Sequence, residues 1–378
     1  MPKEQENIKT LIIIFIVSCS SSDDSGVNVG GPSGGNNGGQ EPVEYLKEHV
    51  SFPIGVALSY EQIASNTNSM INYREVMNNE FNSLTFGNEM KMYNMFPAPD
   101  TYDWSDGDDL VAYAQEHGMR IHGHTLLWHP EYSIPNWLES FSGTDQEFED
   151  QVKNYIINTV AHFAEFEDDN GNPIVESWDV VNEALTSEAM NAVFRQRIGE
   201  DYVAKCHQWA RQGDANVKLF YNDYNIAGDP NKRNEILSMV NNFIANGVPI
   251  DGVGMQMHLN HNWPSPSELQ TAIQQVSDTG LLVHISEIDV KVNYNDDITE
   301  FTSERAQAQS DQYQRAAYYY KTIVPSSQQF GVTVWGLRDI DSWLYDNGTD
   351  WPLLFDNNFD RKQAYIGFTN GLKGISPD

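Results

Sequence analysis

The segment WDVVNEAL, residues 178–185, joins an apolar, β-prone run to an abrupt polar end. Its first half is typical of a buried strand. Asn182 and Glu183 follow directly, and a carboxylate is rarely buried without a partner because leaving water is costly. The segment therefore predicts either a strand that runs out into solvent or a carboxylate that is held in a site.

Segments of the same kind recur along the chain from about residue 50. Each is short, apolar and β-prone, and enough residues for a helix separate most of them. The eight segments are PIGVAL (53–58), FNSLTF (81–86), RIHGHTLLW (120–128), VESWDVV (175–181), VKLFYND (217–223), DGVGMQM (251–257), LLVHISEI (281–288) and GVTVWGL (331–337).

One intervening helix can be predicted in detail. Apolar residues recur at helical spacing at Phe148, Val152, Tyr155, Ile156, Val160 and Phe163. Thr144 and Glu147 form a capping box before them. Strands that alternate with helices indicate parallel βα units. Eight such units predict a single-domain α/β protein, a (β/α)8 TIM barrel over residues 43–378. A doubly wound open sheet is the alternative, but no Gly-rich phosphate turn follows the first segment.

The N-terminal residues have the pattern of a targeting segment. Lys3 and Lys9 precede the apolar run 11–17, which is too short to span a bilayer. The sequence IVSC (16–19) resembles a bacterial lipobox, so we expect residues 1–19 to be a lipoprotein signal peptide with Cys19 as the lipid anchor. Ordinary secretion is the alternative.

Residues 20–42 have the composition of a tether. Seven glycines and almost no apolar side chains lie between Ser20 and Gln40, which predicts a flexible linker. A Ser-Asp-Asp motif after the cysteine resembles a surface-export signal of lipoproteins. We therefore expect an extracytoplasmic protein, either an outer-membrane lipoprotein that faces the cell exterior or a secreted protein.

Charge and cysteine content limit the partners. The net charge of −32, from 54 acidic and 22 basic residues, argues against nucleic acid, since phosphate binding needs clustered Lys and Arg. Cys206 lies in a predicted helix, YVAKCHQWA (202–210), and is interpreted as a packing residue. We expect a monomer that contacts a membrane only through its lipid anchor.

Polar side chains gather at the C-terminal ends of seven predicted strands. In strand order they are Asn88, Glu89 and Lys91; His122, His124, Trp128 and His129; Asn182 and Glu183; Asn222, Asp223, Tyr224 and Asn225; Gln256 and His258; Glu287 and Asp289; and Trp335, Arg338 and Trp343. Because active sites of such barrels lie at this end of the strands, the pattern predicts a lined cleft.

Two of these groups, Glu183 and Glu287, are carboxylates from well-separated strands. Paired carboxylates suit glycoside hydrolysis, in which one protonates the leaving oxygen and the other attacks the anomeric carbon or activates water. A metal-dependent hydrolase is an alternative, since His122 and His124 could bind a metal side by side. Such hydrolases usually add a coordinating Lys and further His or Asp ligands on later strands, whereas the later ends here supply Glu, Asn, Gln and one His. We therefore expect no metal or cofactor and interpret His122 as a hydrogen-bonded core residue.

Six motifs resemble glycoside hydrolase family 10, the endo-β-1,4-xylanases. They are HTLLWH, WDVVNEA, FYNDYN, GMQMH, HISEID and VTVWGLRDIDSW, in this order between about Pro53 and Phe368. The resemblance implies hydrolysis of internal β-1,4 linkages of xylan with retention of configuration. The same chemistry on cellulose or mixed-linkage glucan, and a non-catalytic glycan-binding protein, are the alternatives.

The resemblance also implies roles for individual residues. Glu183 matches the acid/base, which should be protonated, and Glu287 the nucleophile, which should be ionised. The supporting residues are Asn182, His258 and Asp289, and the substrate-binding residues are Asn88, Lys91, His124, Trp128, Tyr224, Gln256, Trp335 and Trp343. Side chains of neighbouring residues in a strand point to opposite faces, yet Asn182 and Glu183 are both assigned to one sugar. We therefore expect the regular pleat to break there.

Three positions depart from the family pattern. Gly87 stands where the family often has a glutamate, and Met92 where it often has a tryptophan. In the longer segment 128–137, Glu131 stands near the place of a glutamine that often binds the same sugar. These changes affect the distal glycone subsite and leave both catalytic positions intact.

Overall fold

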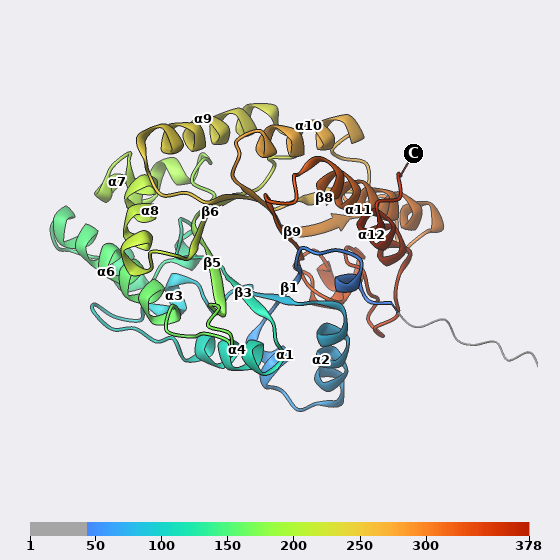
Figure 1. Ribbon diagram of the computed structural model, residues 1–378, viewed down its shortest axis with the longest axis horizontal. Coiled ribbons are helices and arrows are strands. Elements are labelled where there is room, and N and C mark those ends of the chain that lie inside the picture. The colour runs from blue at the N-terminus through green and yellow to red at the C-terminus, as the bar shows by residue number, and fades with distance from the viewer. Residues whose placement is uncertain (1–43, 378) are drawn as a thin grey trace, which may run out of the picture. The chain divides into compact units, whose positions relative to one another are not determined.

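Eight parallel strands close into a barrel in the computed structural model, which describes residues 44–377 (Figure 1). Neighbours around the ring follow the chain order, and β10 closes it by pairing with both β9 and β1. The barrel strands are β1 (Ile54–Leu58), β2 (Ser83–Phe86), β3 (Arg120–Gly123), β5 (Val175–Asn182), β6 (Lys218–Asp223), β7 (Gly252–Met255), β9 (Leu282–Lys291) and β10 (Gln329–Val334). All eight predicted strand segments are therefore confirmed, and with them the barrel.

Two short strands extend the barrel at its C-terminal end. They are β4 (Leu127–Trp128), which pairs with β5, and β8 (His258–Asn260), which pairs with β9. The predicted segment 120–128 is thus interrupted after Gly123. Thr125 Oγ1 and the Leu126 amide both donate to the backbone oxygen of Asp179, at 2.8 and 3.0 Å. This local pairing breaks the regular ladder.

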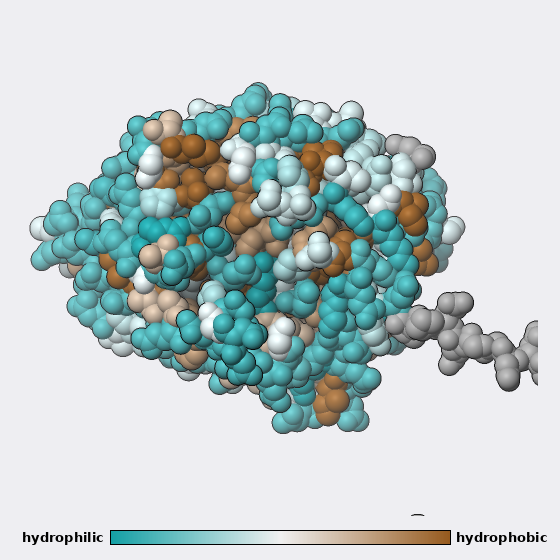
Figure 2. Space-filling model, viewed as in Figure 1, coloured by the Kyte–Doolittle hydropathy of each residue, from teal (hydrophilic) through white to brown (hydrophobic). Residues whose placement is uncertain are grey.

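Helices surround the strands on the outside (Figure 1). They are α1 (Tyr60–Ala64), α2 (Asn68–Glu80), α3 (Met92–Met95), α4 (Ser105–Glu116), α5 (Asn136–Glu139), α6 (Asp145–Phe163), α7 (Val193–Ile198), α8 (Tyr202–Gly213), α9 (Pro230–Asn246), α10 (Pro266–Ser277), α11 (Ser303–Ile323) and α12 (Gln363–Lys373). The face of the molecule shown in Figure 2 is largely hydrophilic, with its hydrophobic residues in separate patches.

Helix α6 confirms the detailed helix prediction. Thr144 Oγ1 accepts the Glu147 amide at 3.2 Å, and Glu147 Oε2 accepts the Thr144 amide at 2.7 Å. These two bonds satisfy amides that a helix start otherwise leaves without partners. The predicted apolar positions are all buried, so one face of α6 packs against the barrel.

Aromatic and imidazole rings fill the barrel interior below the cleft. His122 Nδ1 lies 2.6 Å from Ser177 Oγ, and its ring packs edge-on against His284 at 4.6 Å. Gly252 makes room for the ring of Phe220, because a Cβ there would overlap it. Burial holds the pKa of His284 well below its usual value, so this ring is neutral. The interpretation of His122 as a core residue is confirmed.

Other expectations concern the chain ends and the cysteines. The predicted signal peptide, Cys19 and the tether lie outside the described residues. Cys206 lies fully buried in α8, where burial raises the pKa of its thiol, so its interpretation as a packing residue is confirmed. No helix in the described part of the chain has the length and apolar character that crossing a bilayer requires.

Candidate active site

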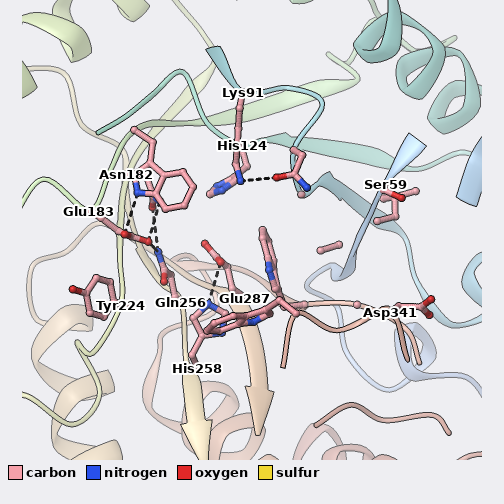
Figure 3. Close-up of a pocket in the computed structure, with 18 of the residues that line it drawn as sticks. Ser59, Lys91, His124, Asn182, Glu183, Tyr224, Gln256, His258, Glu287 and Asp341 are labelled. Carbon is pink, nitrogen blue, oxygen red and sulfur yellow. Dashed lines mark hydrogen bonds and ion pairs between the residues drawn. The ribbon is translucent and has the colours of Figure 1, made fainter. Parts of the chain in front are cut away.

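A cavity of about 670 Å³ opens at the C-terminal end of the barrel (Figure 3). Residues from the C-terminal half of each barrel strand, or from the segment directly after it, line the cavity. The predicted site residues that it brings together are Asn88, Lys91, His124, Trp128, Asn182, Glu183, Tyr224, Gln256, His258, Glu287, Trp335 and Trp343. Asp289 lies behind the residues that line the cavity and contacts His258.

Glu183 accepts hydrogen bonds on both carboxylate oxygens. Gln256 Nε2 donates to Oε1 at 2.8 Å, and Asn182 Nδ2 donates to the same oxygen at 3.2 Å. Trp128 Nε1 donates to Oε2 at 3.0 Å. Burial raises the pKa of Glu183, and the negative charge of Glu287 raises it further, although the hydrogen bonds from Gln256 and Trp128 oppose the change. The environment therefore favours a protonated carboxyl, as expected of a catalytic acid.

The backbone turns sharply where β5 meets the cavity. The register of β5 against β6 shifts between Asp179 and Val181, and the strand ends at Asn182. Glu183 then adopts φ +58°, a left-handed conformation that is uncommon for residues other than glycine. As a result, both Asn182 and Glu183 line the cavity, and the expected break in the pleat is confirmed.

Glu287 has a different environment. Asn222 Nδ2 donates to its Oε1 at 2.7 Å, and His258 Nε2 lies 3.2 Å from its Oε2. The carboxylate is almost fully buried, which by itself would raise its pKa. The hydrogen bond from His258 and the electrostatic interactions with His124 and His258 outweigh burial, so the pKa of Glu287 is lowered. Glu287 is therefore held ionised, as a nucleophile requires.

His258 is held between two carboxylates. Its Nδ1 lies 2.9 Å from Asp289 Oδ2, and its Nε2 faces Glu287. Burial opposes a charged ring, but Asp289 and Glu287 together raise the pKa of His258 to about 10. Trp343 Nε1 donates to the same Asp289 oxygen at 2.9 Å. Asp289 thus keeps His258 protonated and also orients Trp343.

Amide side chains connect the two glutamates. Asn222 Nδ2 donates to Asn182 Oδ1 at 3.0 Å as well as to Glu287, and Ser286 Oγ donates to Asn222 Oδ1 at 2.6 Å. Gln256 Nε2 contacts both Asn182 and Glu183. The sequence placed Asn222 at a strand end, but its contact with Glu287 was not predicted.

The β2 and β3 side of the cavity carries the predicted sugar contacts. Lys91 Nζ donates to Asn88 Oδ1 at 3.1 Å and lies 4.7 Å from the centroid of Trp128. Burial lowers the pKa of Lys91, although both glutamates oppose that change. His124 Nδ1 lies 2.9 Å from Asp179 Oδ2, a buried carboxylate that also binds His122.

Several lining residues were not predicted. Ser59 and Gln62 follow β1, the one strand for which no polar end was recognised, and Asp341 follows β10. From the segment 128–137, Tyr132 lines the cavity, whereas Glu131 is exposed and does not. Gly87 lines the cavity and Met92 is buried in α3.

The metal hypothesis finds no support in the side chains that the structure describes. Within residues 44–377, no group of three or more His, Cys, Asp and Glu side chains is arranged to hold a metal ion. His122 and His124 instead share the Asp179 carboxylate. Burial would raise the pKa of Asp179, but its interactions with His122 and His124 hold this pKa well below its usual range.

Comparison with known proteins gives consistent matches. The model of the family described as "Glycosyl hydrolase family 10" matches residues 44–370. The chain is 37% identical over 359 residues to the endo-beta-1,4-xylanase Xyn10C of Cellvibrio japonicus, covering 88% of this chain and 58% of that protein. It is 35% identical over 330 residues to a beta-1,4-xylanase of Dictyoglomus thermophilum, covering 83% and 86%.

A solved structure also resembles this one. A variant of xylanase10C from Cellvibrio japonicus in complex with xylopentaose superposes with a TM-score of 0.81 at 35% identity, covering 89% of this chain and 70% of that one. This chain spans 58% and 56% of the length of the two Cellvibrio japonicus xylanases that it matches in sequence.

Proposed function

The chain belongs to glycosyl hydrolase family 10, and from this premise we infer that it is an endo-1,4-β-xylanase that retains the anomeric configuration. One observation carries the proposal. Two glutamates in one cavity have opposite pKa shifts, raised for Glu183 and lowered for Glu287. Glycoside hydrolysis by double displacement needs this pair of protonation states.

The first step uses both carboxyl groups. Glu183 donates its proton to the glycosidic oxygen while Glu287 attacks the anomeric carbon, so that the bond to the leaving sugar breaks and a glycosyl-enzyme ester forms. Asn182 lies in the cavity beside Glu183 and is placed to hydrogen-bond a hydroxyl of the reacting sugar. His258 and Asn222 hold Glu287 in position through its two oxygens.

The second step reverses the role of Glu183. Once Glu287 is esterified, its negative charge no longer raises the pKa of Glu183. Glu183, which has given its proton to the leaving sugar, therefore stays ionised and takes a proton from the attacking water. The water oxygen bonds to the anomeric carbon, the ester bond to Glu287 breaks, and the sugar is released with its configuration retained.

Two arguments favour xylan over other β-1,4-glycans as the substrate: the names of the relatives, and two tryptophan rings in the cavity. The relatives are named xylanases, and one solved relative holds xylopentaose. We propose that Trp335 and Trp343, which line the cavity, crowd the hydroxymethyl group that glucose has and xylose lacks. Rates on xylan and carboxymethyl-cellulose test this: equal or faster cleavage of the cellulose derivative would reject the xylan assignment.

Variants of the two glutamates test the mechanism. We expect Glu287→Ala to be inactive on every substrate, because no nucleophile remains. Glu183→Ala should lose activity on xylan but still form the glycosyl-enzyme from an aryl xyloside whose leaving group needs little protonation. Near-normal xylanase activity of Glu287→Ala would contradict the assignment.

A non-catalytic glycan-binding protein is the second candidate from the sequence. A binding site needs aromatic rings and hydrogen bonds, but it gains nothing from opposite pKa shifts of two carboxyl groups. A reducing-sugar assay on xylan separates the two functions, because binding without release of sugar ends would favour the binding protein.

We also propose that the enzyme is anchored outside the cytoplasm through a lipid on Cys19. The lipobox-like sequence at residues 16–19 and the Gly-rich segment after it support this proposal. Labelling with radioactive palmitate, compared between the full chain and Cys19→Ser, tests the anchor. Equal labelling, or equal membrane association, of the two proteins would contradict the anchor. Protease digestion of intact cells tests whether the protein is exposed on the cell surface.

A further inference from the structure

A second cavity of about 630 Å³ adjoins the catalytic one and shares Asn225, His258 and Trp343 with it. The rest of its lining comes mainly from the segments that follow β7 and β9. In the closed strand order, β7 and β9 lie opposite β2 and β3. A saccharide that lies along the β2–β3 side and passes the catalytic glutamates therefore continues over this second cavity.

The second cavity has the surface of a carbohydrate site. Tyr294 and Trp343 are 61% and 64% exposed, so their rings are free to contact a sugar. Asn262 and Asn295 are exposed amides in the same lining. Aromatic rings and amides of this kind suffice to bind an uncharged xylan chain.

Lys291 adds a positive charge that a neutral chain does not need. It is the last residue of β9, it is half-buried, and its ammonium lies 6.0 Å from the ring centroid of Tyr294. The ion pairs formed within residues 44–377 do not include Lys291. Its charge is therefore available to a ligand.

Two carboxylates in the surroundings of Lys291, Asp289 and Asp350, have other partners. Asp289 lines the same cavity, but its Oδ2 is bound by His258 and Trp343. Asp350 feels the charge of Lys291, but its oxygens accept the backbone amides of residues 292, 293 and 351. In a chain with a net charge of −32, which repels anionic polymers, a free ammonium in the cleft gives an acidic group a specific place to bind.

We propose that the second cavity binds the carboxylate of a uronic acid side group on the leaving-group part of the xylan chain, with Lys291 as its counter-ion. This inference rests on the proposed xylanase function and specifies its substrate as xylan with acidic branches. The sugar ring of the branch contacts Tyr294, and the neighbouring amides bind its hydroxyl groups.

A pair of substrates that differ only in charge tests the proposal. Uronate-bearing xylan is compared with the same polymer after chemical reduction of its carboxyl groups to alcohols. Lys291→Gln should lower kcat/KM on the acidic polymer by about two- to fivefold, the effect of one partly exposed ion pair, and leave the reduced polymer unaffected. Lys291→Arg should keep most of the wild-type rate, and about 1 M salt should abolish the difference between the two polymers.

Lys218→Gln is the matched control. Lys218 is also half-buried and makes no ion pair within the described residues, but it begins β6 at the opposite end of the barrel. Lys218→Gln changes the net charge by the same amount as Lys291→Gln and should leave kcat/KM unchanged on both polymers. An equal loss on both polymers for Lys291→Gln, or no loss on the acidic one, would overturn the proposal.

Unbranched xylo-oligosaccharides separate this proposal from the function on which it rests. If the wild type hydrolyses them but Lys291→Gln lowers kcat/KM equally on both polymers, or on neither, only the uronate site is rejected. If the wild type fails to hydrolyse them, the xylanase function fails and the uronate site fails with it.

Discussion

Replacing His258 by glutamine should move the acidic limb of the pH–activity profile. The imidazolium of His258 lies 3.2 Å from Glu287 Oε2 and helps to lower the pKa of that carboxyl. Glutamine can still donate a hydrogen bond but carries no charge. The pKa of Glu287 must therefore rise in the variant, and because the nucleophile works only when ionised, activity must be lost at a higher pH than in the wild type.

The size of the shift follows from the geometry. A hydrogen bond to a charged group contributes about 1.5–3 kcal/mol and an ordinary one about 0.5–1.5 kcal/mol, so keeping the bond but losing the charge of its donor costs about 1–1.5 kcal/mol. About 1.4 kcal/mol corresponds to one pKa unit. The distance of 3.2 Å is long for a charge-assisted bond, and the His258 side chain is 20% exposed. Both facts favour the lower end of the range, so the pKa of Glu287 should rise by about one unit.

The assay is kcat/KM for an aryl xylobioside as a function of pH. The acidic limb should move up by about one pH unit, and below both pKa values the variant should be about tenfold slower than the wild type. His258 itself does not cause this limb, because its own pKa is raised to about 10 and the ring stays protonated throughout the acidic and neutral range.

A second histidine provides the control. His162 on α6 is also 20% exposed and lies 2.7 Å from Asp108, but it is remote from the cavity. His162→Gln should leave the profile unchanged. Thermal unfolding of both variants checks that they are folded, since Asp289 loses its ion pair in His258→Gln. A folded His258→Gln enzyme with an unmoved acidic limb would refute the electrostatic role of His258.

Three further outcomes are expected. Trp128→Phe removes a donor to Glu183, so the pKa of this acid should rise and the basic limb of kcat/KM should move up by at most about one pH unit. Asp179→Asn should lower the free energy of unfolding by about 3–5 kcal/mol, because it removes the charge between two buried histidines. Since the folded pKa of Asp179 is depressed, that stability is present above its unfolded pKa, and urea titrations should show it lost as the pH falls. The Cys206 thiol, whose pKa is raised by burial, should react with a thiol reagent only upon unfolding.

Much of the fold could be predicted because its signals are local. Alternating strand and helix patterns depend on residues close in sequence, as in the apolar stripe and capping box of α6. Eight such units leave few arrangements other than a closed barrel. The interruption after Gly123 was not predicted, because it depends on bonds from Thr125 and Leu126 to a carbonyl on another strand.

The location of the site followed from the fold prediction, but its contacts did not. Parallel strands bring all their C-terminal ends to one rim, so polar strand ends such as Gln256 and Glu287 could be assigned to one cleft. Hydrogen bonds across the cleft depend on side-chain rotamers and on the register between distant strands. The contact of Asn222 with Glu287, and the contribution of Ser59 from β1, therefore appear only in the structure.

The segment WDVVNEAL has features that the sequence determines and features that depend on the tertiary structure. Its sequence alone determined a buried strand with a polar end, and the pairing of its glutamate with one on a distant strand. Only the tertiary structure decided that Glu183 turns to φ +58° and accepts bonds from Trp128 and Gln256. It also decided that burial raises the pKa of Glu183 while His258 lowers that of Glu287, because solvation and charge depend on groups that only folding brings together.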